Sequence, residues 1–285
     1  MSTAPRTSVR TVPLPSGEPV PALGQGTWHL AEGVHPPEQE IAALRLGLDL
    51  GMTLLDTAEM YADGAAEELV GQAIRGRRDE VFLVSKVLPS HATRGGVMAA
   101  CDASLRRLGT DRLDLYLLHW RGRTPLEETV GAFEELRASG RIRHWGVSNF
   151  DVADLEELVA VPGGGGVEDD QVLYNLTRRV IEWTVLPWCA ARGLPITAYS
   201  PIEQGRLAGH PVLRGIAVRH HATSAQVALA WVLAHPGVRA IPRAGTEEHV
   251  RHNRAALDLE LSADDLTALE SAFPPPPGPR QLDVL

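Results

Sequence analysis

Three apolar runs in this sequence end at a titratable side chain: MTLLD at Asp56, VFLVSK at Lys86 and LDLYLLH at His119. Tyr61 follows the first of them closely. A nearly continuous apolar run predicts a parallel strand buried on both faces, and its last residue then lies at the carboxyl edge of the sheet. Several polar strand ends in succession, each followed by a helix-like segment, indicate that these side chains converge on one site.

Taken singly, each of these residues has a simpler structural explanation, such as a capping carboxylate or a core histidine. Together they form a proton-transfer site. A lysine lowers the pKa of an adjacent phenol from its free value of about 10, because the cation favours the phenolate. Asp56 would hold Lys86 charged, a neutral His119 would hydrogen-bond a substrate carbonyl, and Tyr61 would act as general acid. No side chain delivers hydride, so this chemistry implies a nicotinamide cofactor.

The elements that must position these residues alternate between strand and helix. Counted from Leu23, we expect eight strands, each followed by a helix. This alternation predicts the α/β class and a closed (β/α)8 TIM barrel, whose active site lies at the C-terminal ends of the strands. An open doubly wound sheet also alternates, but it usually has fewer units and a phosphate loop after its first strand.

We expect a single barrel domain over residues 1–285. A short β-hairpin is predicted at 7–21, because Ser16-Gly17 is a turn signal between two β-prone pieces. An extra helix is predicted near the C-terminus, and the proline-rich segment 274–285 is predicted to be a loose tail.

The second half of the chain contains clear helix starts. Thr223 and Gln226 have the spacing of a capping box, and Thr246 is placed to cap another helix. The segment Pro201–His221, before the first of these helices, is predicted to be a long loop.

Composition restricts the partners and the compartment. The formal net charge is −9, spread without long acidic runs. This balance argues against nucleic acid and anionic membranes as partners, because both require basic patches. Cys101 and Cys189 have no metal-like spacing and fit a reducing compartment. No stretch reads as a secretory signal or approaches the ~20 apolar residues of a membrane span. We expect a soluble, cytoplasmic protein with a small-molecule substrate.

Over nearly its full length, the sequence resembles the aldo-keto reductase family, as a bacterial-type member with short loops. Any one matching segment is weak evidence, but their common order is specific. The matching segments are LGQGTW (23–28), DTAEMY (56–61), VSK (84–86), LYLLHW (115–120), GVSNF (146–150), QVLYN (171–175) and AYSP (198–201).

The resemblance implies roles for individual residues. It makes Asp56, Tyr61, Lys86 and His119 a catalytic tetrad, and Trp28 and Trp120 walls of the substrate pocket. The residues that it assigns to the cofactor are Gly26, Thr27, Ser148, Asn149, Gln171, Tyr199, Ser200, Pro201, Arg243, Ala244, Gly245, Thr246, His249, His252 and Asn253. Within this set, Ser148, Asn149 and Gln171 would bind the nicotinamide carboxamide, and Tyr199 would stack on the ring.

The segment IPRAGTEEHVRHN (241–253) resembles the family's adenosine-phosphate loop but departs from it. Arg243 stands where lysine is usual and still suits a phosphate. Ala244 replaces a common hydroxyl residue, His249 a common arginine and His252 a common glutamate, whereas Asn253 matches. We therefore expect NADPH to be preferred over NADH, the alternative cofactor, by a smaller margin than a lysine and arginine pair would give.

The resemblance predicts an NADPH-dependent reductase of aldehydes and ketones, with Tyr61 as the acid. The alternative is a non-catalytic, cofactor-binding regulatory subunit on the same barrel. The intact tetrad favours the enzyme. An unrelated barrel isomerase would have no need for Tyr61 beside Lys86.

Overall fold

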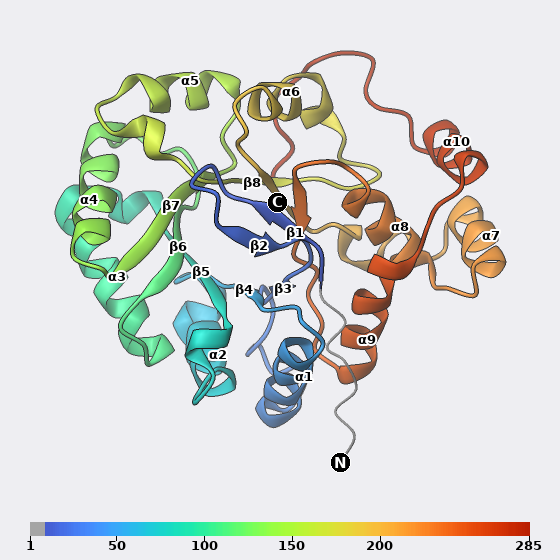
Figure 1. Ribbon diagram of the computed structural model, residues 1–285, viewed down its shortest axis with the longest axis horizontal. Helices are drawn as coiled ribbons and strands as arrows, with labels where there is room; N and C mark the ends of the chain where they lie inside the picture. The colour runs from blue at the N-terminus through green and yellow to red at the C-terminus, as the bar shows by residue number, and fades with distance from the viewer. Residues whose placement is uncertain (1–8) are drawn as a thin grey trace.

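The computed structural model describes residues 9–285. Its main sheet contains eight strands, each parallel to its neighbours, in the spatial order β10-β9-β8-β7-β6-β5-β4-β3 (Figure 1). The two outermost strands of this order also meet, because Leu23 bridges Ala240 and the Gly24 N–H donates to the Ala240 carbonyl at 2.9 Å. The predicted (β/α)8 barrel is therefore confirmed.

The strands are β1 (Thr11–Pro13), β2 (Pro19–Pro21), β3 (Gln25–Gly26), β4 (Leu54–Asp56), β5 (Phe82–Val87), β6 (Leu113–Leu118), β7 (Ile142–Ser148), β8 (Asp170–Leu173), β9 (Ile196–Tyr199) and β10 (Val238–Ala240). The α-helices are α1 (Pro37–Asp49), α2 (Ala65–Ala73), α3 (Arg94–Leu108), α4 (Leu126–Ala138), α5 (Val152–Ala160), α6 (Val185–Ala190), α7 (Pro211–Arg219), α8 (Ser224–Leu233), α9 (Glu247–Ala255) and α10 (Ala263–Ala272). Short 3-10 turns include η1 (Tyr61–Gly64) and η6 (Glu203–Gly205).

Strand periodicity explains why polar side chains reach the barrel interior. Successive side chains of a strand point to opposite faces, so alternate residues line the inside of a barrel. Asp56, Lys86 and His119 each stand two positions after a member of the interior apolar cluster, and therefore lie one layer above it on the same face. That cluster comprises Leu14, Val20, Leu54, Phe82, Val84, Leu115, Leu117 and Ile241.

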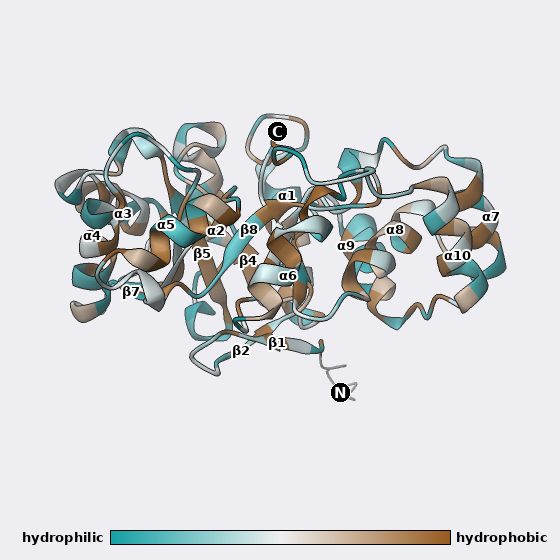
Figure 2. Cartoon of the chain, turned by 90° about the horizontal axis from the view of Figure 1, so that it is seen from above, coloured by the Kyte–Doolittle hydropathy of each residue, from teal (hydrophilic) through white to brown (hydrophobic). Residues whose placement is uncertain are grey.

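The N-terminal hairpin closes the bottom of the barrel. β1 and β2 pair antiparallel through a turn in which Gly17 has φ 90°, a conformation that glycine adopts without strain. Leu14 and Val20 contribute to the interior apolar cluster. Figure 2 shows this hairpin and the C-terminus on opposite sides of the molecule. The hairpin predicted at 7–21 is present, and the first two residues of that range lie outside the described residues.

Helix caps occur where the sequence predicts them. The Thr223 hydroxyl accepts the Gln226 N–H at 3.2 Å, and the Gln226 side chain accepts the Thr223 N–H at 2.8 Å. The Thr246 hydroxyl accepts the His249 N–H at the start of α9. α10, which follows, is the predicted extra helix. These reciprocal bonds satisfy backbone donors that the first helical turn leaves without partners.

The prediction of a long loop at Pro201–His221 was wrong, because η6 and α7 lie within it. Pro211 occupies the first helical position of α7, where its fixed φ favours a helix and its missing N–H has no cost. Leu213, Ile216 and Ala217 form the buried face of α7. α7 packs beside α10 and α8 at one end of the molecule (Figure 1).

The proline-rich segment 274–285 forms neither helix nor strand, as predicted, but it is attached to the barrel rather than loose. The Trp183 indole N–H donates to the Pro276 carbonyl at 2.8 Å, and Leu282 packs on the main core. No helix within residues 9–285 is long and apolar enough to cross a membrane.

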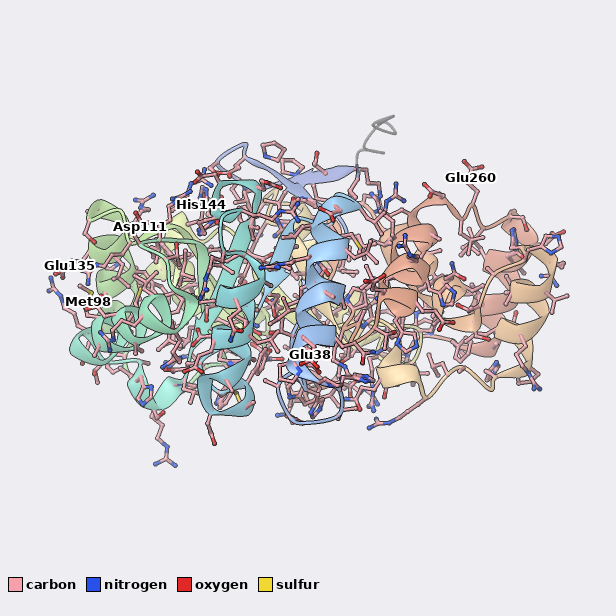
Figure 3. The ribbon with its side chains drawn as sticks, turned by 90° about the horizontal axis from the view of Figure 1, so that it is seen from below. Glu38, Met98, Asp111, Glu135, His144 and Glu260 are labelled. Carbon is pink, nitrogen blue, oxygen red and sulfur yellow. The ribbon has the colours of Figure 1, made fainter. Side chains whose placement is uncertain are left out.

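His144 on β7 connects the hairpin to the barrel floor. Its Nε2 lies 2.8 Å from Glu18 Oε2, and its Nδ1 lies 3.6 Å from Glu168 Oε1. Figure 3 shows His144 on the hairpin side of the molecule and Glu38, near the start of α1, on the other side. Burial lowers the pKa of His144, but hydrogen bonds and charge from Glu168 and Glu18 outweigh it, so the pKa is raised.

We predict that His144→Gln destabilises the protein more at about pH 6 than at about pH 9. Because the folded-state pKa is raised, the stabilisation is complete below the unfolded pKa of about 6.5 and is lost as pH rises through the folded value. Urea unfolding of wild type and variant at several pH values measures the difference. Glu18→Gln should remove much of the same pH dependence, and an equal cost of His144→Gln at both pH values would contradict the assignment.

Candidate active site

The centre of the site is the ammonium group of Lys86 on β5, which is fully buried. Nζ donates to Asp56 Oδ1 at 2.6 Å, to the Thr57 carbonyl at 2.9 Å and to Tyr61 Oη at 3.1 Å. A buried ammonium is tolerated only when it is paired and its N–H groups are satisfied, and these contacts meet both conditions. Three of the four predicted catalytic residues are therefore in direct contact.

Tyr61 reaches Lys86 because the chain turns back sharply after β4. Its ring lies under the ammonium, with Nζ 4.8 Å from the ring centroid. In η1, Ala62 and Asp63 have φ of 48° and 51°, in the left-handed region that residues other than glycine rarely adopt. Such backbone costs free energy and persists only where the surroundings impose it. The strained turn thus coincides with the placement of the Tyr61 hydroxyl.

His119 follows β6, where its N–H donates to the Val87 carbonyl at 2.9 Å. Its ring packs edge-to-face on Tyr61, with centroids 5.8 Å apart. Burial, helped by the charge of Lys86, lowers the pKa of His119 to about 2. The imidazole is therefore neutral near physiological pH, and its buried Nδ1 has no partner among the described residues. This matches the predicted role of a neutral hydrogen-bonding group.

The expectation that Lys86 lowers the pKa of Tyr61 was wrong in its net direction. Burial raises the pKa of the phenol, Lys86 lowers it and the Asp56 carboxylate raises it again, with a net increase. Burial lowers the pKa of Lys86, but Asp56 and Tyr61 outweigh it, so that pKa is also raised. The hydroxyl and the ammonium therefore both keep their protons at neutral pH.

Gln171 on β8 contacts the tetrad directly, which the sequence did not predict. Its Nε2 donates to Asp56 Oδ2 at 2.7 Å, while Oδ1 of the same carboxylate accepts Lys86. Gln171 and Asp56 are both buried. The signal that could have found this contact is strand periodicity, because Gln171 alternates with the outward-facing Val172 and so points into the barrel.

The other predicted nicotinamide contacts gather at the ends of β7 and β9. Tyr199 Oη donates to Asn149 Oδ1 at 2.8 Å, and Asn149 Nδ2 donates to Ser148 Oγ at 3.1 Å. Asn149 has φ 59°, which asparagine tolerates better than most residues. Ser200 and Pro201 continue directly from Tyr199 into the next loop. The structure therefore brings these five residues together at the mouth of the barrel.

The predicted phosphate segment follows β10. Arg243 is exposed, and its Nη1 donates to the His29 carbonyl at 3.2 Å. Ala244, Gly245 and Asn253 are buried, Thr246 and His252 are partly buried, and His249 is exposed. The segment thus presents one guanidinium next to the N-terminus of α9, whose free N–H groups favour an anion.

The remaining predicted residues lie around β3 and the mouth. Thr27 Oγ1 donates to the Asp56 carbonyl at 2.9 Å. Gly26 approaches the backbone of the segment after β10 so closely that a Cβ there would lie 2.6 Å from a carbonyl oxygen. Trp120 is exposed beside His119, with ring centroids 5.0 Å apart, and Trp28 stacks on His29. An exposed tryptophan next to the tetrad fits a substrate wall.

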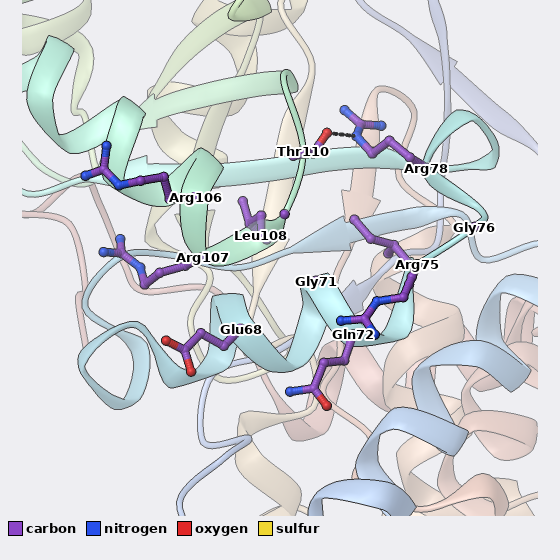
Figure 4. Close-up of a pocket in the computed structure, with 12 residues that line it drawn as sticks. Glu68, Gly71, Gln72, Arg75, Gly76, Arg78, Arg106, Arg107, Leu108 and Thr110 are labelled. Carbon is purple, nitrogen blue, oxygen red and sulfur yellow. Dashed lines mark hydrogen bonds between the residues drawn. The ribbon is translucent and has the colours of Figure 1, made fainter.

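A cavity on the outside of the barrel is separate from this site. It has a volume of about 440 Å³ and lies between α2 and α3 (Figure 4). Two of the four arginines that line it, Arg78 and Arg107, are paired with Asp114 and Glu67 at 2.8 and 2.6 Å. Within residues 9–285 no group of three His, Cys, Asp or Glu side chains is arranged to hold a metal ion.

The sequence model of the aldo/keto reductase family matches residues 22–273. The methylglyoxal reductase YeaE of Escherichia coli (strain K12) is 52% identical over 271 residues, which cover 93% of this chain and 95% of that protein. The glyoxal reductase of Bacillus subtilis (strain 168) is 34% identical over 269 residues, with 92% of each chain covered.

Solved structures of the same family resemble the chain over nearly its full length. An aldo-keto reductase from Klebsiella pneumoniae in complex with NADPH is 51% identical, with a TM-score of 0.95, and covers 98% of this chain and 100% of its own. An aldo/keto reductase from Brucella melitensis is 32% identical, with a TM-score of 0.83, and covers 95% of this chain and 99% of its own.

We predict that Lys86→Met lowers the free energy of unfolding by ~3–5 kcal/mol, because it leaves the Asp56 carboxylate buried without its cation. Urea unfolding at neutral pH measures this change. The double variant Asp56→Asn/Lys86→Met should recover part of the loss. If Lys86→Met unfolds at the wild-type midpoint, the ion pair has no structural role.

Proposed function

Because the chain belongs to the aldo/keto reductase family, we propose that it reduces aldehydes and ketones to alcohols with NADPH, with Tyr61 as general acid. The observation that carries the proposal is the 3.1 Å contact between Tyr61 Oη and the buried Lys86 ammonium. Asp56 fixes the other side of that ammonium at 2.6 Å. This arrangement holds one protonated hydroxyl beside a fixed positive charge.

In the proposed reaction Tyr61 transfers its hydroxyl proton to the substrate carbonyl oxygen, which becomes the oxygen of the alcohol. The phenolate that remains lies next to Lys86, whose charge stabilises it. Lys86 cannot turn away, because Asp56 and the Thr57 carbonyl hold its other N–H groups. The positive charge is therefore in place before the proton moves, and no reorganisation is needed.

His119 complements Tyr61 as a hydrogen-bond donor to the same carbonyl oxygen. A neutral imidazole carries one N–H to donate, and the low pKa of about 2 keeps His119 in this form. The His119 ring contacts the Tyr61 ring edge-on, so one carbonyl oxygen could reach both the imidazole and the hydroxyl in the proposed reaction. This leaves Tyr61 as the residue that gives up a proton.

The described residues fit a nicotinamide dinucleotide. Ser148, Asn149 and the Tyr199 ring lie together at the strand ends above the tetrad. Arg243 and the α9 N-terminus, capped by Thr246, offer a site for an anion such as a phosphate. NADPH, when bound, supplies the hydride that no side chain can provide.

For the substrate we propose small dicarbonyl compounds such as methylglyoxal. Two relatives are named as methylglyoxal and glyoxal reductases, at 52% and 34% identity. Between His119 and the start of α4 the chain has only a short connection, and Trp120 within it is exposed. The non-catalytic alternative has less support, because the buried Lys86 contacts are those a proton-transfer site requires.

We further propose that the protein works in the reducing cytoplasm. Cys101 and Cys189 are free and buried. Burial raises the pKa of the Cys101 thiol to about 12, so it remains an unreactive thiol.

We predict that Tyr61→Phe lowers kcat for methylglyoxal reduction by ~10²–10⁴-fold, because the variant has no proton to give. NADPH oxidation followed by its absorbance is the assay, and NADPH binding should persist. Tyr116→Phe is the matched control, since Tyr116 packs against Phe133 outside the barrel interior. A wild type that binds but never oxidises NADPH with aldehydes would favour the regulatory subunit, and an active Tyr61→Phe would remove Tyr61 as the acid.

We predict that the wild type binds NADPH more tightly than NADH and that Arg243→Ala reduces this preference by about ten- to a hundredfold, the value of one charge-assisted contact. Fluorescence titration with both cofactors measures it. Arg251→Ala is the control, because Arg251 lies on α9, the helix that follows Arg243, and pairs with Glu247 on its exposed side. Equal wild-type affinities, or an unchanged ratio in Arg243→Ala, would show that Arg243 does not bind the phosphate.

A further inference from the structure

A tight turn after β8 places Arg178 at the mouth of the barrel. The side chain of Asn175, which is fully buried, accepts the N–H and the hydroxyl of Thr177, both at 2.9 Å. The Arg178 N–H donates to the Asn175 carbonyl at 3.0 Å, and the two residues form an isolated bridge. The start of the Arg178 side chain is therefore rigidly positioned.

The loop after β9 has a backbone that needs external support. Ser200, Glu203 and Gln204 have φ of 45°, 46° and 55°, and none of them is glycine. Each such residue costs free energy and is maintained by its surroundings. Asn175 Nδ2 supplies part of that support, because it donates to the Ser200 carbonyl at 2.9 Å and to Glu203 Oε2 at 2.8 Å.

Arg178 adds further support through Glu203. The Glu203 side chain is 6% exposed, and its Oε1 accepts Arg178 Nη2 at 3.1 Å. Burial raises the pKa of Glu203, but hydrogen bonds from Arg178 and Asn175 outweigh it and lower the pKa. A buried carboxylate is stable only with such partners, so Glu203 ties the loop to the turn.

The other side of the same guanidinium faces the C-terminal segment. Arg178 Nη1 lies 3.8 Å from Asp283 Oδ1, and the Asp283 side chain is 19% exposed. Burial raises the pKa of Tyr199, and the backbone of Leu285, two residues beyond Asp283, lies near enough to the hydroxyl to oppose that rise. The end of the chain therefore lies beside the aromatic residue from which the loop begins.

We propose that Arg178 is a positioning residue that couples the cofactor side of the site to the C-terminal segment. It joins Glu203, in the loop that begins with Ser200 and Pro201, to Asp283 in the C-terminal segment. The inference rests on the proposed function and on the family resemblance that assigns Ser200 and Pro201 to the cofactor. A planar guanidinium can engage two carboxylates at once, whereas the point charge of lysine suits one.

The coupling predicts that substitution of Asp283 changes cofactor binding. Because coupling between two sites is reciprocal, a change in the C-terminal segment must alter cofactor binding, although Asp283 has no assigned cofactor contact. Arg178 touches none of the proposed reacting atoms, so its loss should change binding constants and leave kcat for bound substrate nearly unchanged. A residue with a purely structural role would change the unfolding midpoint without this separation.

The experiment compares Arg178→Gln, Arg178→Lys and Asp283→Asn with two controls. Arg206→Gln removes an exposed cation 3.5 Å from Glu203, and Arg280→Gln removes a cation 3.1 Å from Asp283 within its own segment. NADPH dissociation constants come from fluorescence titration, and KM and kcat come from NADPH oxidation with methylglyoxal. Urea unfolding identifies variants whose fold is impaired.

We expect Arg178→Gln to raise the NADPH dissociation constant by about tenfold and to leave kcat nearly unchanged. Asp283→Asn should weaken NADPH binding by about two- to fivefold, the range of a partly exposed ion pair. Arg178→Lys should restore NADPH binding only in part, because the point charge of lysine suits one of the two carboxylates. The double variant Arg178→Gln/Asp283→Asn should bind NADPH no more weakly than Arg178→Gln alone.

Normal NADPH binding by Asp283→Asn would overturn the coupling. The same conclusion follows if the Arg206 and Arg280 controls change NADPH affinity as much as Arg178→Gln does. Both results are NADPH affinities measured by titration, so they do not depend on whether the wild type oxidises NADPH with methylglyoxal. A wild type that fails to do so contradicts the proposed function instead, and the titrations still report whether the C-terminal segment affects cofactor binding.

Discussion

The ion pair between Lys86 and Asp56 constrains most of what surrounds it. An ammonium with no exposed surface inside a barrel requires a carboxylate and further acceptors within hydrogen-bond reach. β4 and β5 satisfy this requirement because both side chains lie on the interior face of the barrel, next to the interior apolar cluster. The turn after β4 then supplies the Thr57 carbonyl and Tyr61 as the remaining acceptors. The chemical group and the local fold are therefore determined together.

Much of this could be predicted from the sequence, because strand ends and caps are local signals. Apolar runs that stop at Asp56, Lys86 and His119 identified the strands and the layer where the site lies. The helix α7 was missed because proline and glycine within Pro201–His221 are turn signals, and its buried face is evident only once α8 and α10 cover it. Local sequence patterns do not show which distant helices will cover a given face.

The electrostatics of the site were harder to predict for the same reason. The sign of the Tyr61 pKa shift depends on how much solvent the hydroxyl loses and on Asp56 lying near enough to cancel part of the effect of Lys86. Residue types indicate the partners but not their burial. The Gln171 contact with Asp56 was likewise hidden, because a long-range hydrogen bond between two inward-facing groups depends on the barrel radius as well as on periodicity.

Two buried carboxylates at the barrel mouth are held in the same way, with different consequences. One oxygen of Asp56 accepts Lys86 and the other accepts Gln171, so the Lys86 ammonium next to Tyr61 has one fixed position. Glu203 divides its oxygens between Arg178 and Asn175, so a strained loop keeps one conformation. In both places burial makes loss of the hydrogen-bond partners costly in free energy. The carboxylate and its partners are therefore held in one arrangement. The first carboxylate orders the groups that move protons, and the second orders the loop that starts at the end of β9. Pre-organisation of the site therefore extends beyond the residues that carry out its chemistry.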